Sequence, residues 1–216
     1  MKKEICILLC VISIIACSDK EYMQRFADIK YKGKDVPTHG IQCNGFYFES
    51  DNRKDDVVWI FYKDGTFVRT FLRYKLDSLL QGRPINLNDA VEKWGRKSQH
   101  WGQSYGLYKI NGDTINVTVY DRFYWYYNIN KYKYKIIDTN NIIMCFYESP
   151  SLKQRDHYIY EMNVKLTYVP ADSIPSPDNG FLKKKKWYWE NESDWEEYMK
   201  KRRIGGKKAG DENWGL

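Results

Sequence analysis

The segment 105–120 constrains the fold more than any other part of the chain. Asn111-Gly112, a pair that favours a tight turn, separates two runs in which apolar and polar residues alternate. The apolar positions are Tyr108, Ile110, Ile115, Val117 and Val119. A two-residue loop would pair Tyr108 with Ile115, and a four-residue loop would pair it with Val117. Both registers place the apolar side chains on one face, so the segment predicts an antiparallel sheet with one buried face.

Strands of similar pattern recur along the chain. We expect about eight, joined mostly by tight turns, near residues 44–50, 57–63, 66–73, 104–110, 114–121, 130–137, 142–149 and 157–169. Successive hairpins without an exposed edge predict an all-β fold, an eight-stranded antiparallel up-and-down barrel. A short helix is expected in the 74–102 insertion. A capping box at 193–196 predicts a C-terminal helix that ends near Arg203.

The second and third expected strands form a hairpin of their own. Asp64-Gly65 as a two-residue turn would place Phe61 opposite Val68. Apolar residues occupy both faces of this pair. We therefore expect the hairpin to be covered on both sides or to line a cavity.

The sixth and seventh expected strands are rich in tyrosine and lysine. In 131–137, tyrosine or isoleucine alternates with lysine, so we expect Tyr132 and Tyr134 inside the barrel. The lysines are expected on a solvated face rather than at an anion site. An even-length loop into the next strand predicts three more interior residues: Ile143, Cys145 and Tyr147.

The N-terminus has the pattern of a secretory signal. Lys2 and Lys3 precede an almost wholly apolar run over 5–15, which is too short for a mature membrane span. The run closes with Ile-Ile-Ala before Cys17, an ending that resembles a bacterial lipobox. This resemblance implies cleavage before Cys17 and acylation of its thiol. The alternative is an ordinary signal in which Cys17 is incidental.

These patterns divide the chain into four expected parts. They are a lipoprotein signal peptide at 1–16, a membrane tether at 17–43, a barrel domain at 44–203 and a disordered tail at 204–216. An acylated Cys17 would anchor the protein in outer-membrane lipid, on the periplasmic or the cell-surface face. The formal net charge of +7 fits solubility or contact with anionic envelope surfaces.

Two cysteines, Cys43 and Cys145, remain after the signal peptide and Cys17. An exported protein can form disulfides, so they predict either one bridge or two separate buried thiols. Neither cysteine has a Cys or His at ligand spacing, so we expect no metal site and no cofactor.

A Gly-x-Ser-x-Gly sequence at 102–106 matches the nucleophile elbow of hydrolases. The elbow requires a strand before the serine and a helix after it, whereas here the expected order is reversed. None of the three histidines pairs locally with a nucleophile. We therefore expect a protein without catalytic residues.

Four lysines at 183–186 precede Trp-Tyr-Trp at 187–189. We expect Trp187 or Trp189 to pack onto the barrel while the lysines stay in solvent. Association with lipid or polysaccharide is the alternative. Nucleic acid is not an expected partner of an exported protein.

The segments 45–47, 61–67, 106–110 and 113–115, taken together with the lipobox, give a wider resemblance. The chain resembles the lipocalin-like (calycin) lipoproteins of Gram-negative bacteria over roughly residues 44–203. Lipocalins proper carry Gly-x-Trp in the first strand, and Tyr47 stands at the Trp position here. The resemblance implies a barrel that holds a small apolar or amphipathic ligand.

Two sets of residues are candidates for recognition. The expected ligand pocket is lined by Trp59, Arg69, Tyr108, Tyr132, Tyr134 and Tyr160. The alternative is a surface module that recognises a glycan or a protein through the exposed aromatic residues Tyr124, Trp125 and Tyr126. A cavity of at least ~300 Å³ would favour the pocket, and a filled barrel would favour the surface module.

Overall fold

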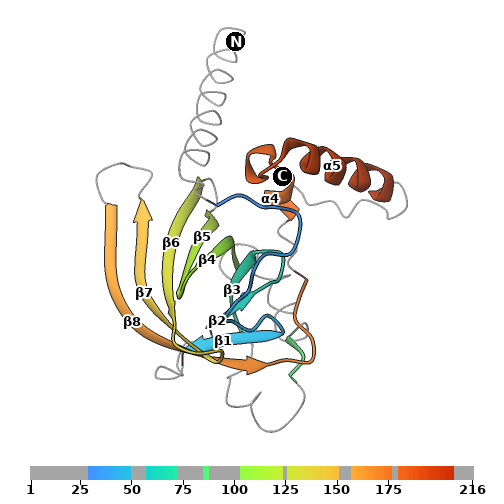
Figure 1. Ribbon diagram of the computed structural model, residues 1–216. Coiled ribbons are helices and arrows are strands. Elements are labelled where there is room, and N and C mark those ends of the chain that lie inside the picture. The colour runs from blue at the N-terminus through green and yellow to red at the C-terminus, as the bar shows by residue number, and fades with distance from the viewer. Residues whose placement is uncertain are drawn as a thin grey trace.

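Eight strands pair in chain order and close into an antiparallel barrel, because β1 also pairs with β8 (Figure 1). The computed structural model describes residues 29–49, 57–72, 85–87, 103–123, 126–150, 157–176 and 180–206. The eight strands are β1 (Gly45–Glu49), β2 (Val57–Phe61), β3 (Thr66–Phe71), β4 (Gln103–Asn111), β5 (Thr114–Phe123), β6 (Tyr126–Ile136), β7 (Asn141–Pro150) and β8 (His157–Pro170). This architecture confirms the predicted up-and-down barrel.

The β4–β5 hairpin has the second of the two registers considered. Tyr108 lies opposite Val117, and the chain turns at Gly112, whose φ of +61° suits glycine. Ile115, Val117 and Val119 are buried in the barrel interior. The prediction of a buried apolar face on this hairpin is therefore confirmed.

The predicted register of the β2–β3 hairpin was wrong by one residue. Phe61 pairs with Phe67 rather than with Val68. The turn holds three residues because Gly65, at φ +80°, adds a residue in the left-handed conformation after a tight turn. Val68 consequently faces outward. Apolar side chains are buried on both faces of the pair, as expected.

A β-bulge in β7 overturned part of another prediction. The pairing of β6 with β7 shifts between Lys133 and Tyr134, and Cys145 is the additional residue. Ile142 and Met144 therefore lie inside in place of Ile143 and Cys145. The bulge restores the alternation, so Tyr147 faces the interior as predicted.

Aromatic rings fill part of the barrel interior. Phe61 lies at their centre, with ring centroids 5.1 Å from Phe67, 5.2 Å from Tyr108 and 5.6 Å from Tyr47. All four side chains are almost completely buried. Edge-to-face packing of this kind makes this part of the interior a solid core.

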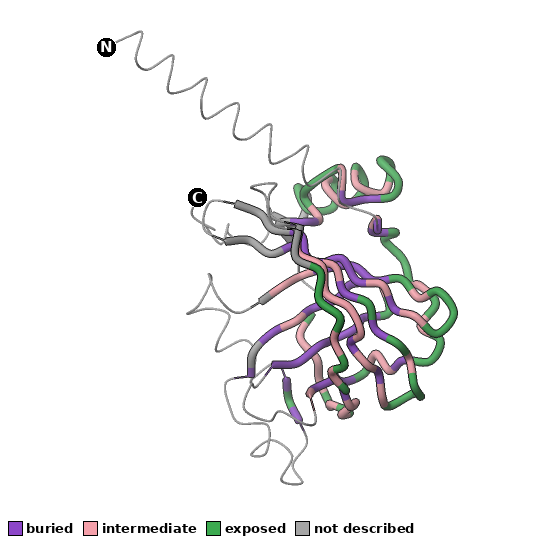
Figure 2. Tube along the Cα trace, turned by 90° about the vertical axis from the view of Figure 1, so that its left-hand side faces the viewer, coloured by how far each residue is buried: buried purple, intermediate pink, exposed green. Residues whose placement is uncertain are grey.

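Two further apolar layers cover the outside of the barrel. Ile85 and Leu87 lie over the outer face of β1–β3, where backbone hydrogen bonds join 85–87 to residues 172 and 173. The other layer covers β4–β6 with residues from both ends of the described chain: Ile29, Tyr31, Leu182, Tyr188 and Trp189. Most described residues of β1, β2, β3 and β5 are buried, whereas β7 and β8 carry mostly intermediate and exposed residues (Figure 2).

Three helical segments follow the barrel: α4 (Gly180–Lys183), the short 3-10 helix η1 (Lys186–Tyr188) and α5 (Glu192–Gly206). Helix α5 is the predicted C-terminal helix. It begins at Glu192, one residue before the predicted capping box at 193–196, and Asn191 Nδ2 donates to Asp194 Oδ2 at 3.0 Å. The helix expected in the 74–102 insertion lies outside the described residues, apart from 85–87. No helix in the described ranges is long and apolar enough to cross a membrane.

The segment before β1 packs on the barrel from Ile29 onward. Ile41 is buried within the interior cluster, and Gln42 donates a backbone hydrogen bond of 3.0 Å to the Tyr47 hydroxyl. The Tyr47 hydroxyl in turn donates to the Thr139 carbonyl in the β6–β7 turn. The second half of the expected tether is therefore part of the folded domain.

Candidate functional site

The structure places the six candidate pocket residues at different depths. Trp59, Tyr108, Tyr132 and Tyr134 belong to the buried interior cluster. Arg69 is partly buried, and its guanidinium carbon lies 5.9 Å from the centre of the Trp59 ring. Tyr160 is 49% exposed.

Tyr108 belongs to the solid core rather than to a binding surface. Its hydroxyl donates a buried hydrogen bond of 2.7 Å to the Tyr62 carbonyl and lies 3.9 Å from the Cys43 thiol. Burial raises the pKa of the Tyr108 hydroxyl, so it stays neutral. Because its polar group is satisfied by neighbouring residues, Tyr108 has no free group to offer a ligand.

Four tyrosines on three neighbouring strands form a continuous series, which we call the tyrosine ladder. Ring centroids lie 6.2 Å apart between Tyr134 and Tyr132, 5.0 Å between Tyr132 and Tyr147, and 5.9 Å between Tyr147 and Tyr160. Exposure rises from 0% at Tyr134 to 8% at Tyr132 and 49% at Tyr160. The ladder therefore leads from the core to solvent along β6, β7 and β8.

Tyr147 was missing from the predicted pocket, although it joins the two parts of the ladder. Its ring stacks on Tyr160 with an interplanar angle of 19°, and its hydroxyl donates to Asn130 Oδ1 at 3.2 Å. The signal in the sequence was the alternation that placed Tyr147 inside. Its link to Tyr132 and Tyr160 requires the cross-strand register, which the bulge decides.

A polar pair lies at the buried end of the ladder. Trp59 Nε1 and Tyr134 Oη are both buried, and neither has a hydrogen-bond partner among the described residues. Burial holds the pKa of Tyr134 well above its ordinary value, although the charge of Arg69 and a loose polar contact with Trp59, which does not reach normal hydrogen-bond geometry, act in the opposite direction. An unpaired buried polar atom costs about 1–3 kcal/mol, so the pair is a favourable place for an added polar group.

The two cysteines are separate free thiols in the structure. Cys145 lies at the bulge and donates to the Lys133 carbonyl at 3.3 Å. Cys43 lies beside Tyr108 in the segment before β1, where burial raises the pKa of its thiol.

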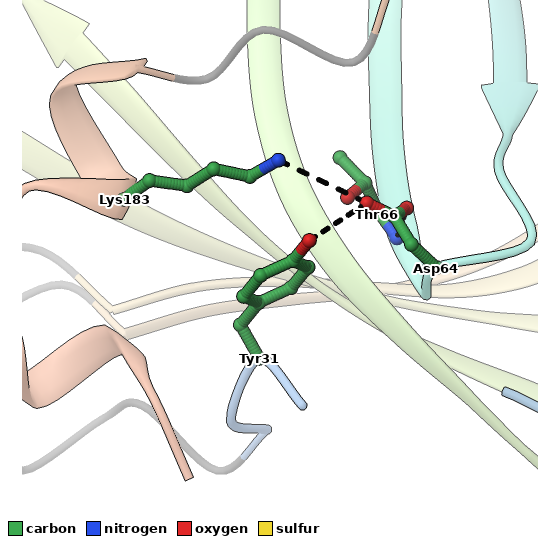
Figure 3. Close-up of polar contacts among 4 residues, drawn as sticks. All are labelled: Tyr31, Asp64, Thr66 and Lys183. Atoms are coloured by element: carbon green, nitrogen blue, oxygen red, sulfur yellow. Dashed lines mark hydrogen bonds and ion pairs between the residues drawn. The ribbon is translucent and has the colours of Figure 1, made fainter. Parts of the chain in front are cut away.

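A second polar cluster holds both ends of the domain on the β2–β3 turn (Figure 3). Asp64 accepts hydrogen bonds of 3.0 Å from the Tyr31 hydroxyl and from the Thr66 backbone amide. Lys183 Nζ lies 3.9 Å from the Asp64 carboxylate and 4.9 Å from the centre of the Tyr31 ring. The mutual pairing of these charges makes the cluster a clamp between segments.

The run at 183–189 packs on the barrel through its aromatic residues as expected, but Lys183 is partly buried beside Asp64 rather than in solvent. Tyr188 and Trp189 are buried against the barrel, and Trp189 Nε1 donates to the Lys183 carbonyl at 2.9 Å. The next three side chains, Lys184, Lys185 and Lys186, are exposed. Lys133 and Lys135 of β6 are also exposed, as predicted for a solvated face.

The Gly-x-Ser-x-Gly sequence does not form a nucleophile elbow. Ser104 lies within β4, opposite Arg69 of β3. A Cβ at Gly106 would lie 2.4 Å from the Thr118 carbonyl oxygen, so the glycine permits close strand pairing. Within the described ranges, no three His, Cys, Asp or Glu side chains gather as a possible metal site.

Several predicted residues lie outside the described part of the chain. They include the signal peptide, Cys17 and the aromatic residues Tyr124 and Trp125. Tyr126 begins β6, but its side chain is not among those described.

The described residues define a closed, eight-stranded, up-and-down β-barrel with an aromatic interior. Comparison of the chain with protein-family models, with curated proteins and with solved structures gave no match. The evidence about function therefore comes from the fold and from the residues themselves.

Proposed function

We propose that this protein is a lipid-anchored lipoprotein of the bacterial envelope whose barrel binds a small apolar or amphipathic ligand without catalysis. The observation that carries the binding proposal is the tyrosine ladder. It leads from the half-exposed Tyr160 to the buried Tyr134, where unpaired polar atoms lie.

The outer end of the ladder suits the apolar part of a ligand. Tyr147 and Tyr160 are nearly parallel, so a flat or apolar group can extend their stack. Stacked aromatic groups contribute about 0.5–1.5 kcal/mol beyond the area that they bury. Tyr160 is the residue through which a ligand would first contact the interior.

The inner end of the ladder suits a polar group that accepts hydrogen bonds. Trp59 Nε1 is a donor, and the Tyr134 hydroxyl can donate or accept. Arg69 adds a positive charge beside Trp59 and favours an acceptor or an anion there. An amphipathic molecule with an apolar body and a polar head matches both ends.

The location in the envelope is supported by the sequence at 1–17. A basic start, an apolar run and the ending before Cys17 resemble lipoprotein signals. A diacylglycerol and an N-linked acyl chain on Cys17 would give stable anchoring in outer-membrane lipid. The periplasmic face and the cell surface both fit this anchor.

Native mass spectrometry of the full protein, purified from its own envelope in mild detergent, tests both parts of the proposal. We expect the mature mass to begin at Cys17 with three acyl chains and to carry a further noncovalent adduct. Tyr160→Ala should lose the adduct. Ile159→Ala should keep it, because Ile159 is an exposed neighbour on the same strand, and alternation points it outward. Wild-type protein without an adduct would contradict ligand binding, and an unacylated N-terminus would contradict the anchor.

A further inference from the structure

The C-terminal segment carries two groups of exposed basic residues, which we together call the basic platform. It consists of Lys184, Lys185, Lys186, Lys200, Lys201, Arg202 and Arg203, all exposed. The first three precede η1 or begin it, and the other four lie in the second half of α5. We propose that the basic platform contacts the anionic lipid headgroups of the membrane that carries the Cys17 anchor. This proposal rests on the proposed anchor for its orientation.

The platform is held on a fixed frame. Trp195 of α5 donates through Nε1 to the Lys184 carbonyl at 3.2 Å, and Tyr198 packs on Trp189 with ring centroids 5.4 Å apart. Trp189 is itself buried against the barrel. These contacts fix the first half of α5 beside the lysine run, so both groups of basic residues belong to one fixed part of the fold.

Most of the platform's charge is not neutralised within the domain. Lys186 pairs with Glu192, and Lys201 pairs with Glu197 at 2.7 Å. No ion pair joins the other five platform residues to an acidic side chain in the described ranges. The acidic side chains of α5 lie in its first half, between Glu192 and Glu197. The platform therefore presents a positive surface to solvent, which complements anionic headgroups.

Helix stability explains only part of this charge. Basic residues in the last turns of α5 interact favourably with the helix dipole. This reason applies to Arg203 and its neighbours. It does not apply to Lys184 and Lys185, which lie before η1 and not at the end of a long helix. Contact with a flat, negatively charged partner would give both groups one role.

The first residues of the described chain lie beside the segment that carries the platform lysines. Tyr31 forms a parallel bridge with Trp189, through backbone hydrogen bonds of 2.9 Å from Tyr31 to Tyr188 and 2.8 Å from Glu190 to Tyr31. Lys30 Nζ donates to the Trp187 carbonyl at 2.6 Å. In Figure 1, α5 lies at the same end of the molecule as the blue segment with which the described chain begins.

The length of chain between anchor and domain keeps the platform near the bilayer. Twelve positions separate Cys17 from Ile29. Fully extended, such a linker spans roughly 40 Å. An anchored domain therefore stays close to the membrane surface. The lipid headgroups are then present at a high effective concentration around the domain, so even a weak electrostatic contact forms often.

Vesicle binding of the unacylated mature chain tests this proposal separately from the anchor. This chain covers residues 17–216 with Cys17→Ser and lacks the signal. It is mixed with vesicles of phosphatidylcholine alone, or of phosphatidylcholine with phosphatidylglycerol, and sedimented at low and at high salt. We expect binding only to the phosphatidylglycerol vesicles, with a loss at high salt.

Two matched variants locate the contact. Replacement of four platform residues by glutamine (Lys184→Gln, Lys185→Gln, Arg202→Gln and Arg203→Gln) should weaken binding roughly tenfold or more. The control variant removes the same charge from β6 and β8, with Lys131→Gln, Lys133→Gln, Lys135→Gln and Lys165→Gln. It should change binding by no more than about twofold. Circular dichroism verifies that both variants fold.

The outcomes separate the explanations. Equal losses in the two variants, or no preference for phosphatidylglycerol in the wild-type chain, would overturn the proposal. Tighter platform-dependent binding to an anionic polysaccharide, such as dextran sulfate, would overturn it in favour of a polysaccharide surface. A last outcome separates the two proposals. If vesicle binding depends on the platform but the native protein carries no acyl chains, the headgroup contact is supported and only the lipid anchor is contradicted.

Discussion

Tyr147 of β7 and Tyr160 of β8 lie opposite each other in the barrel wall, and their rings stack with centroids 5.9 Å apart. The stack continues inward through Tyr132 to Tyr134, while its outer member is half exposed. A continuous aromatic series that reaches solvent offers a ligand a stacking surface leading to the interior. The stack is therefore the feature that best supports a role in ligand binding.

The hydroxyl of Tyr134 should contribute nothing to stability in the unliganded protein, because it is buried without a partner. We expect Tyr134→Phe to leave the free energy of unfolding unchanged or to raise it by up to ~1 kcal/mol. Tyr108→Phe is the matched control, since it removes a satisfied buried hydrogen bond and should cost about 1–2 kcal/mol. Urea denaturation measures both. A loss at Tyr134 as large as the loss at Tyr108 would show that its hydroxyl is paired.

Stability should fall at alkaline pH. Burial raises the pKa of Tyr47 to about 12 from an ordinary 10.0, and it raises those of Tyr62 and Tyr108 in the same direction. Below pH 10 both folded and unfolded chains keep these protons, so the stabilisation is fully present. As pH rises toward the folded values, the unfolded chain loses protons that the folded chain keeps, and stability is lost.

Absorbance of the tyrosinate form, followed with circular dichroism as pH rises, measures this effect. We expect one group of tyrosines to ionise near pH 10 while the barrel is folded. A second group should ionise only as the barrel unfolds. If all tyrosines ionise near pH 10 while the fold stays intact, the claim that some tyrosine hydroxyls are buried is contradicted.

The clamp at Asp64 should stabilise the domain. Asp64→Ala removes the acceptor of two hydrogen bonds and the partner of Lys183, so we expect a loss of about 1–3 kcal/mol. Trypsin should also cleave faster after Lys30 and Lys32. Asp113→Ala provides the control, because this exposed aspartate lies in the β4–β5 turn, and among the described residues its side chain hydrogen-bonds to Thr114 alone. Its change should stay within about 0.5 kcal/mol, and equal effects of the two changes would refute the clamp.

Gly106 should be essential for the pairing of β4 with β5. A Cβ there would lie 2.4 Å from the Thr118 carbonyl, so Gly106→Ala forces the strands apart. We expect it to destabilise the fold by about 1–3 kcal/mol, as overpacking does. Ser104→Ala in the same sequence motif should leave stability within about 0.5 kcal/mol. Thermal unfolding measures both, and a larger effect at Ser104 than at Gly106 would contradict this assignment.

Much of the barrel could be predicted because period-two alternation is a local property. Tyr108, Ile115 and Val117 were placed correctly by alternation around a tight turn. The registers that failed depend on single residues that no alternation reveals. Asp64-Gly65 fits a two-residue or a three-residue loop, and Cys145 could be recognised as a bulge only from its partner strands.

The candidate site was only partly predictable for the same reason. Alternation identified Tyr132 and Tyr134 as interior residues, but their stacking with Tyr147 depends on pairing across three strands. The contact between Tyr31 and Asp64 joins an irregular segment to a turn. Such contacts follow from the closed barrel and leave no periodic signal in the sequence.

The most direct test of ligand binding is a fluorescence titration with N-phenyl-1-naphthylamine, an apolar aromatic probe. We expect wild-type protein to bind the probe saturably. Tyr160→Ala should weaken binding by at least about fivefold, since a stacked ring contributes on the order of 1 kcal/mol. Ile159→Ala, an exposed neighbour on β8, should leave the affinity unchanged within about twofold. Equal affinity in the two variants, or no saturable binding, would contradict a binding site at the tyrosine ladder.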